Sequence, residues 1–312
     1  MKAEQEVYEQ SARIIDMLMS DSDEMLKEAQ QELTDYTRTH NREGALCDAI
    51  LPPTEFDQAL LVKDMHTDQP KMLFEYEQTS PFAAPVDWGA TPQDFIPRGR
   101  RYPLVFQQVQ TDNIVINLLE LQTYGQDMRA IMGDNMTKDL IARRDHVFFN
   151  KARQILSGLG VTLPWAGKPM HVSMGSPLSW SAFTRGKNTM RDTPFSIEPE
   201  RSVMNNLRLA DLEIAAVKEN PSTDSSLDMV FKGWTETQFA GLKTLFTIKR
   251  KLIPTAQCFL FGDPKFLGRY VNWIPPKMVI EKKAMIVQAY VYEVYGITLA
   301  HPGALAVNEF LG

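Results

Sequence analysis

The stretch YGQDMRAIMGDNMTKDLIARRDHVFFNKARQIL, residues 124–156, decides the fold of this 312-residue chain. Apolar residues recur in it at intervals of three and four, which places them in one stripe along an α-helix. Charged side chains mostly fill the other face, no proline interrupts the run, and the Ser-Gly-Leu-Gly of residues 157–160 ends it. At 1.5 Å per residue, about 30 residues form a rod of roughly 45 Å. We predict one long helix around which the chain is built, although the core helix of an ordinary domain would show the same pattern.

An irregular loop with a strand on each side precedes this helix. Residues 71–77 alternate apolar and polar side chains, and residues 104–119 are rich in Val, Ile and Gln; both patterns predict strands. The loop between them, 79–103, holds five prolines and no periodic pattern, and a loop that long in a compact domain is usually functional. It carries six candidates for an interaction surface: Phe82, Trp88, Phe95, Arg98, Arg100 and Arg101. A hairpin arm of this kind cannot bury its aromatic side chains on itself, so we expect it to lie against another surface.

The N-terminal segment is acidic and is predicted to be helical. Residues 1–35 contain ten acidic and three basic residues, and the whole chain has a net charge of -6. Two helical pieces are expected within residues 1–38, the second of them starting near residues 20–23, Ser-Asp-Ser-Asp, which offer a cap and an acidic first turn. Short charged helices are marginal alone. We expect them to lie on a surface of this chain or of a neighbour; a solvated acidic leader is the alternative.

The C-terminal half is predicted to be mostly extended. Residues 157–207 are rich in Pro, Gly, Ser, Trp and Met without periodicity, which indicates loops and short strands. A small α/β lobe is expected over roughly 205–272, with helices at 208–219 and 236–245 and strands at 246–252 and 257–261. Residues 284–295 are apolar on both faces of a strand, so this strand is expected to be covered on two sides. A turn at residues 301–303 leads into a further strand.

Motifs for catalysis, metal binding or nucleotide binding are missing from the sequence. The five histidines lie far apart, Cys47 and Cys258 form no metal-binding pair, and there is no phosphate loop, dinucleotide fingerprint or nucleophile elbow. We therefore predict no catalytic residue, no cofactor and no metal, and expect that the protein is not an enzyme. The cysteines are expected to be free thiols in a reducing compartment. No apolar run is long enough to predict a membrane span.

Taken in order, these pieces resemble a major capsid protein of a tailed bacteriophage with the Hong Kong 97-like fold. Three stretches add to the likeness: residues 42–53 are similar to the linker before the hairpin, 120–124 to the entry of the spine helix, and 285–307 to the closing strands. The resemblance covers nearly the whole chain. It implies an α+β fold with an N-terminal arm, an extended hairpin loop, a long spine helix, a peripheral domain and an axial domain.

The resemblance also implies how the chain is divided. The segments are an N-terminal arm at 1–68, the extended hairpin loop at 69–119, a peripheral domain at 120–204 with the spine helix at 124–156, an axial domain at 205–272, and returning strands of the peripheral domain at 273–312. In this arrangement the hairpin tip lies over the neighbouring subunit of the same ring. Its three aromatic residues would fill pockets there, and its three arginines would pair with the neighbour's carboxylates.

The function implied by the resemblance is that of a major head protein in the virion. Copies of the chain, assembled in the host cytoplasm as pentamers and hexamers, would form the icosahedral shell that encloses viral double-stranded DNA. Separate scaffolding and portal proteins are expected partners, with cement proteins as an option, and neither sequence-specific DNA binding nor a membrane is expected. The acidic arm should lie on the outer surface or on a neighbour, because packaged DNA would repel it.

One family feature is not expected here. Some members of the family join a hairpin lysine covalently to an asparagine of a neighbouring subunit. This chain has no lysine between Lys71 and Lys138. We therefore predict that the shell is held by buried area and charge pairs, without such a cross-link.

Two other interpretations are compatible with the sequence. An encapsulin-like shell of a cellular compartment would keep the fold and change the role, and neighbouring genes would separate the two. A soluble α/β enzyme with dispersed catalytic residues would use residues 79–103 as an active-site lid. Such lids usually carry glycine hinges, whereas this loop is stiffened by proline and rich in aromatic residues.

Overall fold

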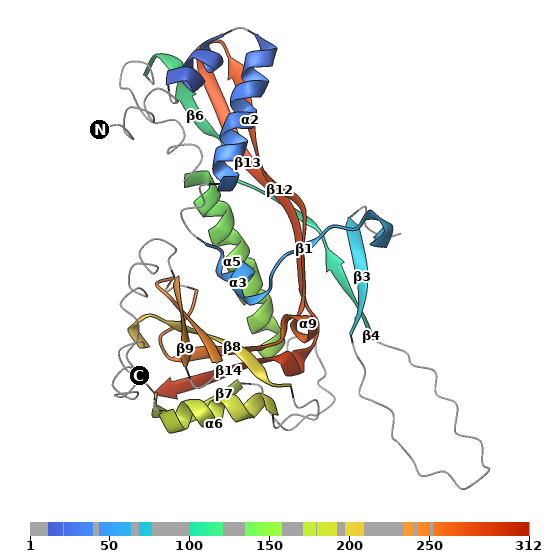
Figure 1. Ribbon diagram of the computed structural model, residues 1–312, viewed down its shortest axis with the longest axis vertical. Helices are drawn as coiled ribbons and strands as arrows, with labels where there is room; N and C mark the ends of the chain where they lie inside the picture. Colours follow the sequence, from blue (N-terminus) through green and yellow to red (C-terminus); the bar gives the residue numbers. More distant parts are fainter. Residues whose placement is uncertain are drawn as a thin grey trace, which may run out of the picture.

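The fold consists of two sheets joined by a long helix, α5 (Asn135–Leu156), with a small third sheet at one side (Figure 1). This computed structural model describes residues 12–20, 22–39, 44–63, 69–76, 100–120, 135–157, 171–178, 180–191, 197–208, 234–239, 242–249 and 252–311. The statements below refer to these residues.

The long sheet is built on two antiparallel strands, β12 (Gly268–Lys283) and β13 (Ile286–Leu299). Strands β5 (Gln107–Gln110) and β6 (Ile114–Asn117) pair with β13, and the short β1 (Thr54–Glu55) pairs with β12. The predicted strands at residues 284–295 and before the long helix therefore come together in one sheet.

Two N-terminal helices cover one face of this sheet at its far end. Residues 12–19 are helical, and α2 spans Asp23–Thr39. Leu18 and Leu33 are fully buried and belong to one apolar cluster with Val287 of β13. The opposite face is open there, because the side chain of Ile286 is 44% exposed. The expectation that residues 284–295 are covered on two sides is thus wrong for the first half of the strand.

The second sheet has six strands in the order β7-β14-β11-β8-β10-β9. Their bounds are β7 His171–Pro177, β8 Pro199–Asn205, β9 Trp234–Phe239, β10 Leu242–Thr247, β11 Gln257–Gly262 and β14 Leu305–Leu311. Segments far apart in the chain thus pair within one sheet, and its strands do not follow the predicted boundaries at 204/205 and 272/273. The division into an axial and a peripheral domain stays a proposal.

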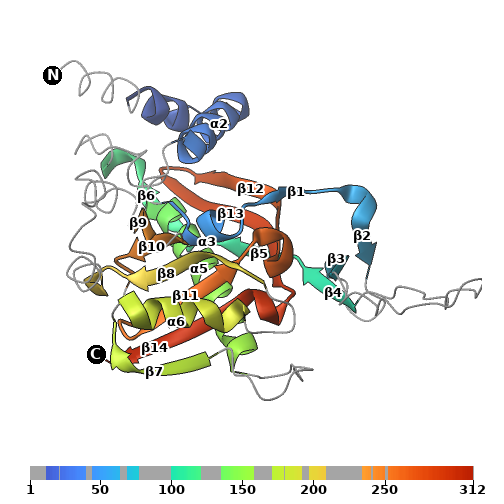
Figure 2. The same cartoon turned by 60° about the horizontal axis from the view of Figure 1, so that its bottom comes forward.

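Two helices pack on opposite faces of the six-stranded sheet (Figure 2). On one face, α5 places the ring of Phe149 with its centroid 5.4 Å from that of Phe259. On the other face, α6 (Trp180–Arg191) approaches β14 so closely that a Cβ at Gly186 would meet the side chain of Asn308 at 2.2 Å. The main apolar core lies between these layers.

The third sheet, which we call the hairpin sheet, contains three antiparallel strands. They are β2 (Leu61–Lys63), β3 (Pro70–Tyr76) and β4 (Arg100–Val105). The remaining short elements are α3 Leu46–Ile50, η1 Gln58–Leu60, α9 Pro264–Leu267 and η3 Pro302–Ala304. The predicted hairpin is confirmed for β3 and β4, but its second strand spans Arg100–Val105, so residues 100–103 of the predicted loop are strand. Residues 107–110 and 114–117, expected in the hairpin, pair with β13 instead. Residues 77–99 at the tip lie outside the described residues.

The long helix is confirmed from Asn135 to Leu156, and the strand predicted at 257–261 is also confirmed as β11. Three expectations about the C-terminal half are wrong. Residues 180–191 form a helix instead of loops and short strands, the predicted helix at 236–245 is replaced by the hairpin of β9 and β10, and the predicted strand at 246–252 ends at Thr247. The predicted helix at 208–219 lies almost entirely outside the described residues.

Candidate assembly surfaces

The hairpin sheet has an inner face that docks on the long sheet. Met72 and Leu104 lie opposite each other in neighbouring strands, are 1% and 0% exposed, and belong to one apolar cluster with Val271 and Val294 of the long sheet. A Cβ at Gly296 would meet the Cδ2 atom of Leu104 at 2.2 Å. Because only a residue without a side chain fits there, this glycine lets the hairpin root sit directly on β13.

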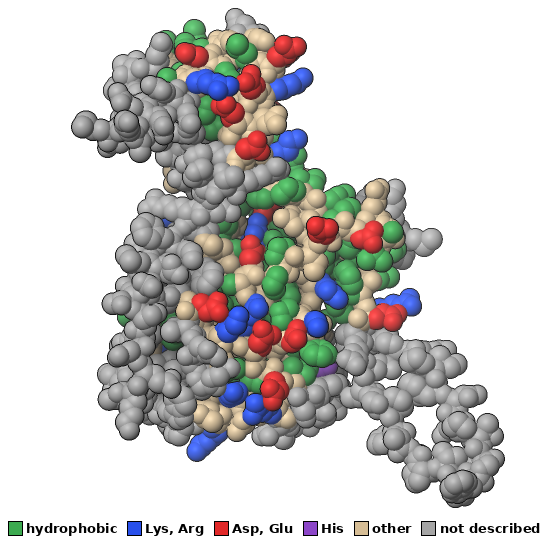
Figure 3. All heavy atoms as spheres, viewed as in Figure 1, with side chains coloured by type: hydrophobic (Ala, Val, Ile, Leu, Met, Phe, Trp, Pro, Cys, Tyr) green, Lys and Arg blue, Asp and Glu red, His purple; other side chains and the backbone are tan. Residues whose placement is uncertain are grey.

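The outer face of the hairpin sheet carries apolar side chains that the chain itself does not cover. Val62, Leu73 and Val105 are 41%, 39% and 39% exposed and come from β2, β3 and β4 in turn. Figure 3 shows apolar side chains at the surface in this region, at the right of the view. In the strand register Lys71 lies between Val62 and Val105, so a basic side chain is interspersed with the apolar ones on this face. Exposed apolar area beside polar residues on a folded chain is typical of an interaction site.

The six residues predicted to make inter-subunit contacts are placed only in part. Phe82, Trp88, Phe95 and Arg98 lie outside the described residues. Arg100 starts β4, with its backbone opposite Tyr76, and nothing is described of its side chain. Arg101 is exposed, and its Nε donates to Oε1 of Glu75 in the same hairpin at 2.6 Å. Such an exposed pair contributes only about 0–1 kcal/mol, so Arg101 can exchange this partner for another carboxylate at little cost.

The acidic arm is fastened to the far end of the long sheet. The Nζ of Lys282 donates to the carbonyl oxygens of Met19 and Ser20, each at 2.9 Å, at the C-terminal end of the helix at residues 12–19. A cation there satisfies open carbonyls and complements the helix dipole. From α2, the amide of Gln30 donates to the carbonyl of Met278 at 2.7 Å. The arm thus lies on a surface of its own chain, one of the two arrangements expected from the sequence.

A buried charged cluster joins α5, α3 and the long sheet. Arg144 of α5 binds Glu293 of β13 through Nη2, and its Nη1 donates to Oδ2 of Asp48 in α3 at 3.1 Å. Burial raises the pKa of the Asp48 and Glu293 carboxyl groups, and Arg144 opposes that rise. Burial alone would lower the pKa of Arg144, but the carboxylates around it hold it above its usual value, so the guanidinium stays charged.

A second ion pair extends this cluster toward the six-stranded sheet. Asp145 is fully buried; one of its oxygens accepts the backbone N–H of Cys47 at 2.8 Å, and the other binds the Nζ of Lys249 at 2.8 Å. Burial, and then the charge of Asp145, raises the pKa of the Cys47 thiol. Because removal of one partner of a buried pair leaves an uncompensated charge, the cluster fixes the mutual placement of helix, linker and sheet.

Sequence reasoning missed this cluster and assigned Arg144 and Asp145 to the charged face of the long helix. Both are buried on the apolar face instead. The sequence spacing does indicate that Arg144 is buried, because it lies four residues from both Leu140 and Phe148 in the apolar stripe. Glu293 likewise continues the alternation of Val287, Ala289 and Val291 in β13.

No group of three or more His, Cys, Asp or Glu side chains within the described part of the chain could hold a metal ion. No helix among the described residues is long and apolar enough to cross a membrane.

Comparisons with known proteins identify the fold. No protein-family model matches the sequence, and no curated protein sequence matches it either. Among solved structures, the capsid of cyanophage P-SCSP1u is similar with a TM-score of 0.59 at 9% identity, over 88% of this chain and 90% of that one. The capsid of Ralstonia phage GP4 gives 0.55 at 10% identity, over 88% and 92%. A virus-like particle from Pyrococcus furiosus gives 0.50 at 16% identity, over 93% and 100%.

Proposed function

We propose that this chain is the major capsid protein of a tailed bacteriophage and that it self-assembles into the icosahedral shell around the double-stranded DNA genome. The chain has the Hong Kong 97-like capsid fold, which confirms the fold predicted from the sequence. The observation that supports the function best is that this likeness extends over 88% of the chain and includes nearly the whole of the capsid chain to which it is compared.

The open face of the hairpin sheet supports assembly with further copies. Val62, Leu73 and Val105 expose apolar area on an arm whose inner face is already used for docking. Burying such area contributes about 25 cal/mol per Å², and a closed shell repeats each contact many times. The hairpin of one subunit would thus cover part of its neighbour, with Phe82, Trp88 and Phe95 in apolar pockets there and Arg98, Arg100 and Arg101 on carboxylates.

Cohesion by non-covalent contacts fits the composition of the hairpin. Beyond Lys71 the chain has no lysine before Lys138, so the outer part of the hairpin offers no lysine for a covalent link. We propose that the protein is a structural component of the virion without catalytic activity. Its partners would be further copies, as pentamers and hexamers, with separate scaffolding, portal and cement proteins, in a shell assembled in the host cytoplasm.

The test is assembly of the purified protein, measured by light scattering and negative-stain microscopy. Closed particles of uniform size that contain phage DNA in infected cells would support the proposal. Leu73→Lys, which puts a charge on the open face of the hairpin, should suppress the particles, whereas Met25→Lys on α2, 45% exposed in the free chain, serves as the matched control. A stable monomer under all conditions would refute the proposal.

A further inference from the structure

The outer edge of β12 is long and has few strand partners. On one side, β12 pairs with β13 from Gly268 to Lys283. On the other side, the described strands pair with it only at Val271 and Asn272, through β1. An unpaired strand edge presents a row of N–H and C=O groups on which another chain can add a strand, and this leads to aggregation. A chain that associates in one defined way therefore has to close such an edge.

The sequence itself blunts the first part of this edge. The register between β12 and β13 shifts twice between Asn272 and Lys277, and such bulges bend a strand and disrupt its pairing. Pro275 and Pro276 stand in the same stretch, and neither has an N–H to offer to a further strand. From Met278 onward, β12 has neither a register shift nor a proline.

At Met278 the backbone N–H and C=O groups point away from β13. Met278 lies opposite Val291. The N–H of Val291 donates to Oγ1 of Thr111 at 3.0 Å, and its carbonyl oxygen accepts the N–H of Thr111 at 2.9 Å. Met278 and Val291 thus form a non-hydrogen-bonded pair, in which the backbone groups of both residues point outward. Those of Met278 lie on the edge that β1 leaves open.

Helix α2 binds both of these backbone groups. The N–H of Met278 donates to Oγ1 of Thr34 at 3.3 Å, and Nε2 of Gln30 donates to the carbonyl oxygen of Met278 at 2.7 Å. The hydroxyl of Thr34 in turn donates to the carbonyl oxygen of Gln30 at 2.7 Å, which leaves its oxygen to accept from the strand. One turn of the helix thereby supplies the acceptor and the donor that a neighbouring strand would supply.

The contact between α2 and β12 is buried. Figure 1 shows α2 along the upper part of β12 and β13. Met278 and Ile280 are 0% and 4% exposed and belong to one apolar cluster with Leu33 of α2. Because buried backbone groups without a partner are costly, the side chains of Gln30 and Thr34 are matched to this strand position.

We propose that Gln30 and Thr34 determine the specificity of assembly by closing the edge of β12 at Met278, where a strand of a second copy would otherwise pair. The inference rests on the proposed shell function and gives the acidic arm a role in it. With the edge closed, copies associate through the side-chain surfaces of the shell and not by adding strands to one another.

The test is the double variant Gln30→Leu/Thr34→Val, which nearly keeps the size of both side chains and removes their hydrogen bonds. In the dilute subunit, the amide of Met278 should exchange its hydrogen roughly fivefold faster, the factor that one hydrogen bond of ordinary strength contributes. At assembly concentrations, we expect closed particles to be lost in favour of large aggregates. Light scattering and microscopy measure this loss, and infrared spectroscopy should show the band of intermolecular β-sheet.

The matched control is Gln31→Leu/Thr137→Val. Gln31 is exposed on α2, and the buried hydroxyl of Thr137 on α5 has no hydrogen-bond partner among the described residues. The control makes the same two chemical changes without touching β12, so it should form particles as the native protein does. Thr34→Ser, which keeps the hydroxyl, should also form them.

A further change separates edge closure from a general loss of stability. Val279 is half-buried and follows the buried Met278 in the strand, so its side chain lies on the other face of the sheet. A lysine on an edge strand discourages pairing with a second strand. Added to Gln30→Leu/Thr34→Val, Val279→Lys should therefore suppress the β-sheet aggregates although neither hydrogen bond to Met278 is restored.

The outcomes separate this inference from the function on which it rests. Particles formed equally well by Gln30→Leu/Thr34→Val would overturn edge closure, as would aggregates that Val279→Lys leaves unchanged. Either result leaves the shell function standing. If the native protein forms no particles while Val279→Lys still suppresses the aggregates of the double variant, the shell function falls and edge closure stands.

Discussion

At the scale of single residues, the guanidinium of Arg144 connects helix α5 to the linker helix α3 and to the long sheet. It pairs with Glu293 and Asp48, and the Asp145–Lys249 pair stands beside it in the sequence of α5. Arg144, Glu293 and Asp145 are buried, whereas the side chain of Asp48 is 37% exposed. The buried charges depend on their partners for compensation, since several kcal/mol are lost when an ion leaves water unpaired.

Replacing Arg144 by Met should destabilise the unassembled subunit by about 3–5 kcal/mol, because Glu293 is then buried without a counter-charge. Urea unfolding followed by circular dichroism measures the change. Arg143→Met is the matched control, as this neighbouring residue on the same helix is exposed, and it should change stability by less than about 0.5 kcal/mol. The double variant Arg144→Met/Glu293→Gln should lose less unfolding free energy than Arg144→Met alone. An equal or larger loss of stability would contradict a coupled pair.

His301 makes stability depend on pH. Its Nδ1 accepts the backbone N–H of Gly303 at 3.0 Å, and burial lowers its pKa. The neutral ring is therefore favoured in the fold, and its contribution is present above the unfolded-state value of about 6.5 and is lost as pH falls through the lower folded-state value.

The matched variant is His301→Asn, since an asparagine oxygen accepts the N–H two residues on without titrating. We expect the melting temperature of the native protein to fall more between pH 7.5 and pH 5 than that of the variant. Parallel profiles for the two proteins would show that His301 does not titrate in the fold.

At the scale of elements, the docking of the hairpin sheet on β13 depends on Gly296. Gly296→Ala places a Cβ within 2.2 Å of the Cδ2 of Leu104, so the hairpin root must shift, at a cost of about 1–3 kcal/mol for overpacking. Hydrogen exchange of β4 should become faster in this variant.

A compensating change provides the control. Leu104→Ala removes the clashing atoms and alone costs about 2–5 kcal/mol through the cavity it leaves. Combined with Gly296→Ala, it should destabilise the protein by less than the sum of the single changes. If the destabilisations of the two single variants simply add in the double variant, the two side chains are not in contact.

Elements with a strong period were predictable from sequence, and those made by tertiary contact were not. The stripe of α5 and the alternation in β3 and β13 are local patterns that survive folding. Helix α6 contains Gly186 and several poor helix formers, and it is helical because Ala182, Phe183 and Met190 pack on the sheet. Residues 236–245 have helix-like apolar spacing but become strands because β8 offers a partner edge to β10.

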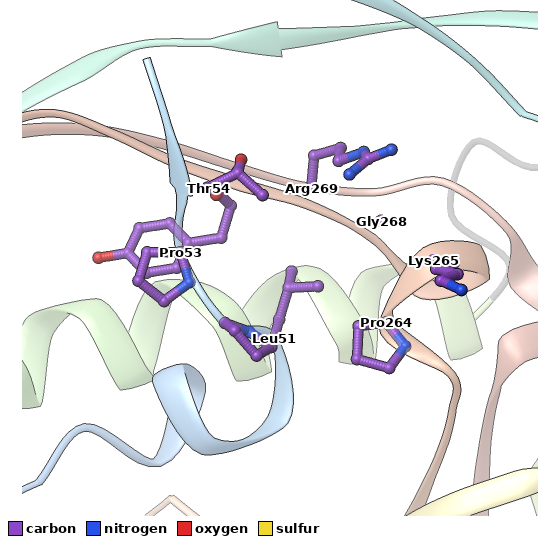
Figure 4. Close-up of a pocket in the computed structure, with 9 residues that line it drawn as sticks. Leu51, Pro53, Thr54, Pro264, Lys265, Gly268 and Arg269 are labelled. Carbon is purple, nitrogen blue, oxygen red and sulfur yellow. Dashed lines mark hydrogen bonds between the residues drawn. The ribbon is translucent and has the colours of Figure 1, made fainter.

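The candidate site was predictable only in outline. The hairpin and its root could be inferred from alternation and proline content, and the structure places Arg101 on it. The small pocket in Figure 4 unites residues 51–54 with residues 264–265 and 268–270. These two stretches are more than 200 positions apart in the sequence, so no local pattern predicts that they are in contact. The burial of Arg144 and Asp145 was not predicted, because a charged residue in an amphipathic helix is usually solvated.

At the scale of the whole molecule, exposed apolar side chains of the described residues gather, among other places, on the outer face of the hairpin sheet and at the far end of the long sheet. At the latter, Val115, Leu119 and Met285 are 57%, 52% and 50% exposed. A shell extends in two dimensions, so each subunit needs more than one contact surface for its neighbours.

Particles of this protein should come apart into single chains in denaturant. After boiling in detergent, we expect one band at 35.5 kDa, because residues 72–137, which include the hairpin tip, contain no lysine for a covalent link. A ladder of multiples under reducing conditions would contradict this.

The most direct test of the account is the structure of purified particles by cryo-electron microscopy. We predict a closed icosahedral shell in which Val62, Leu73 and Val105 of each hairpin sheet are buried against a neighbouring copy. A monodisperse monomer, or a shell in which these three side chains stay open to solvent, would contradict it.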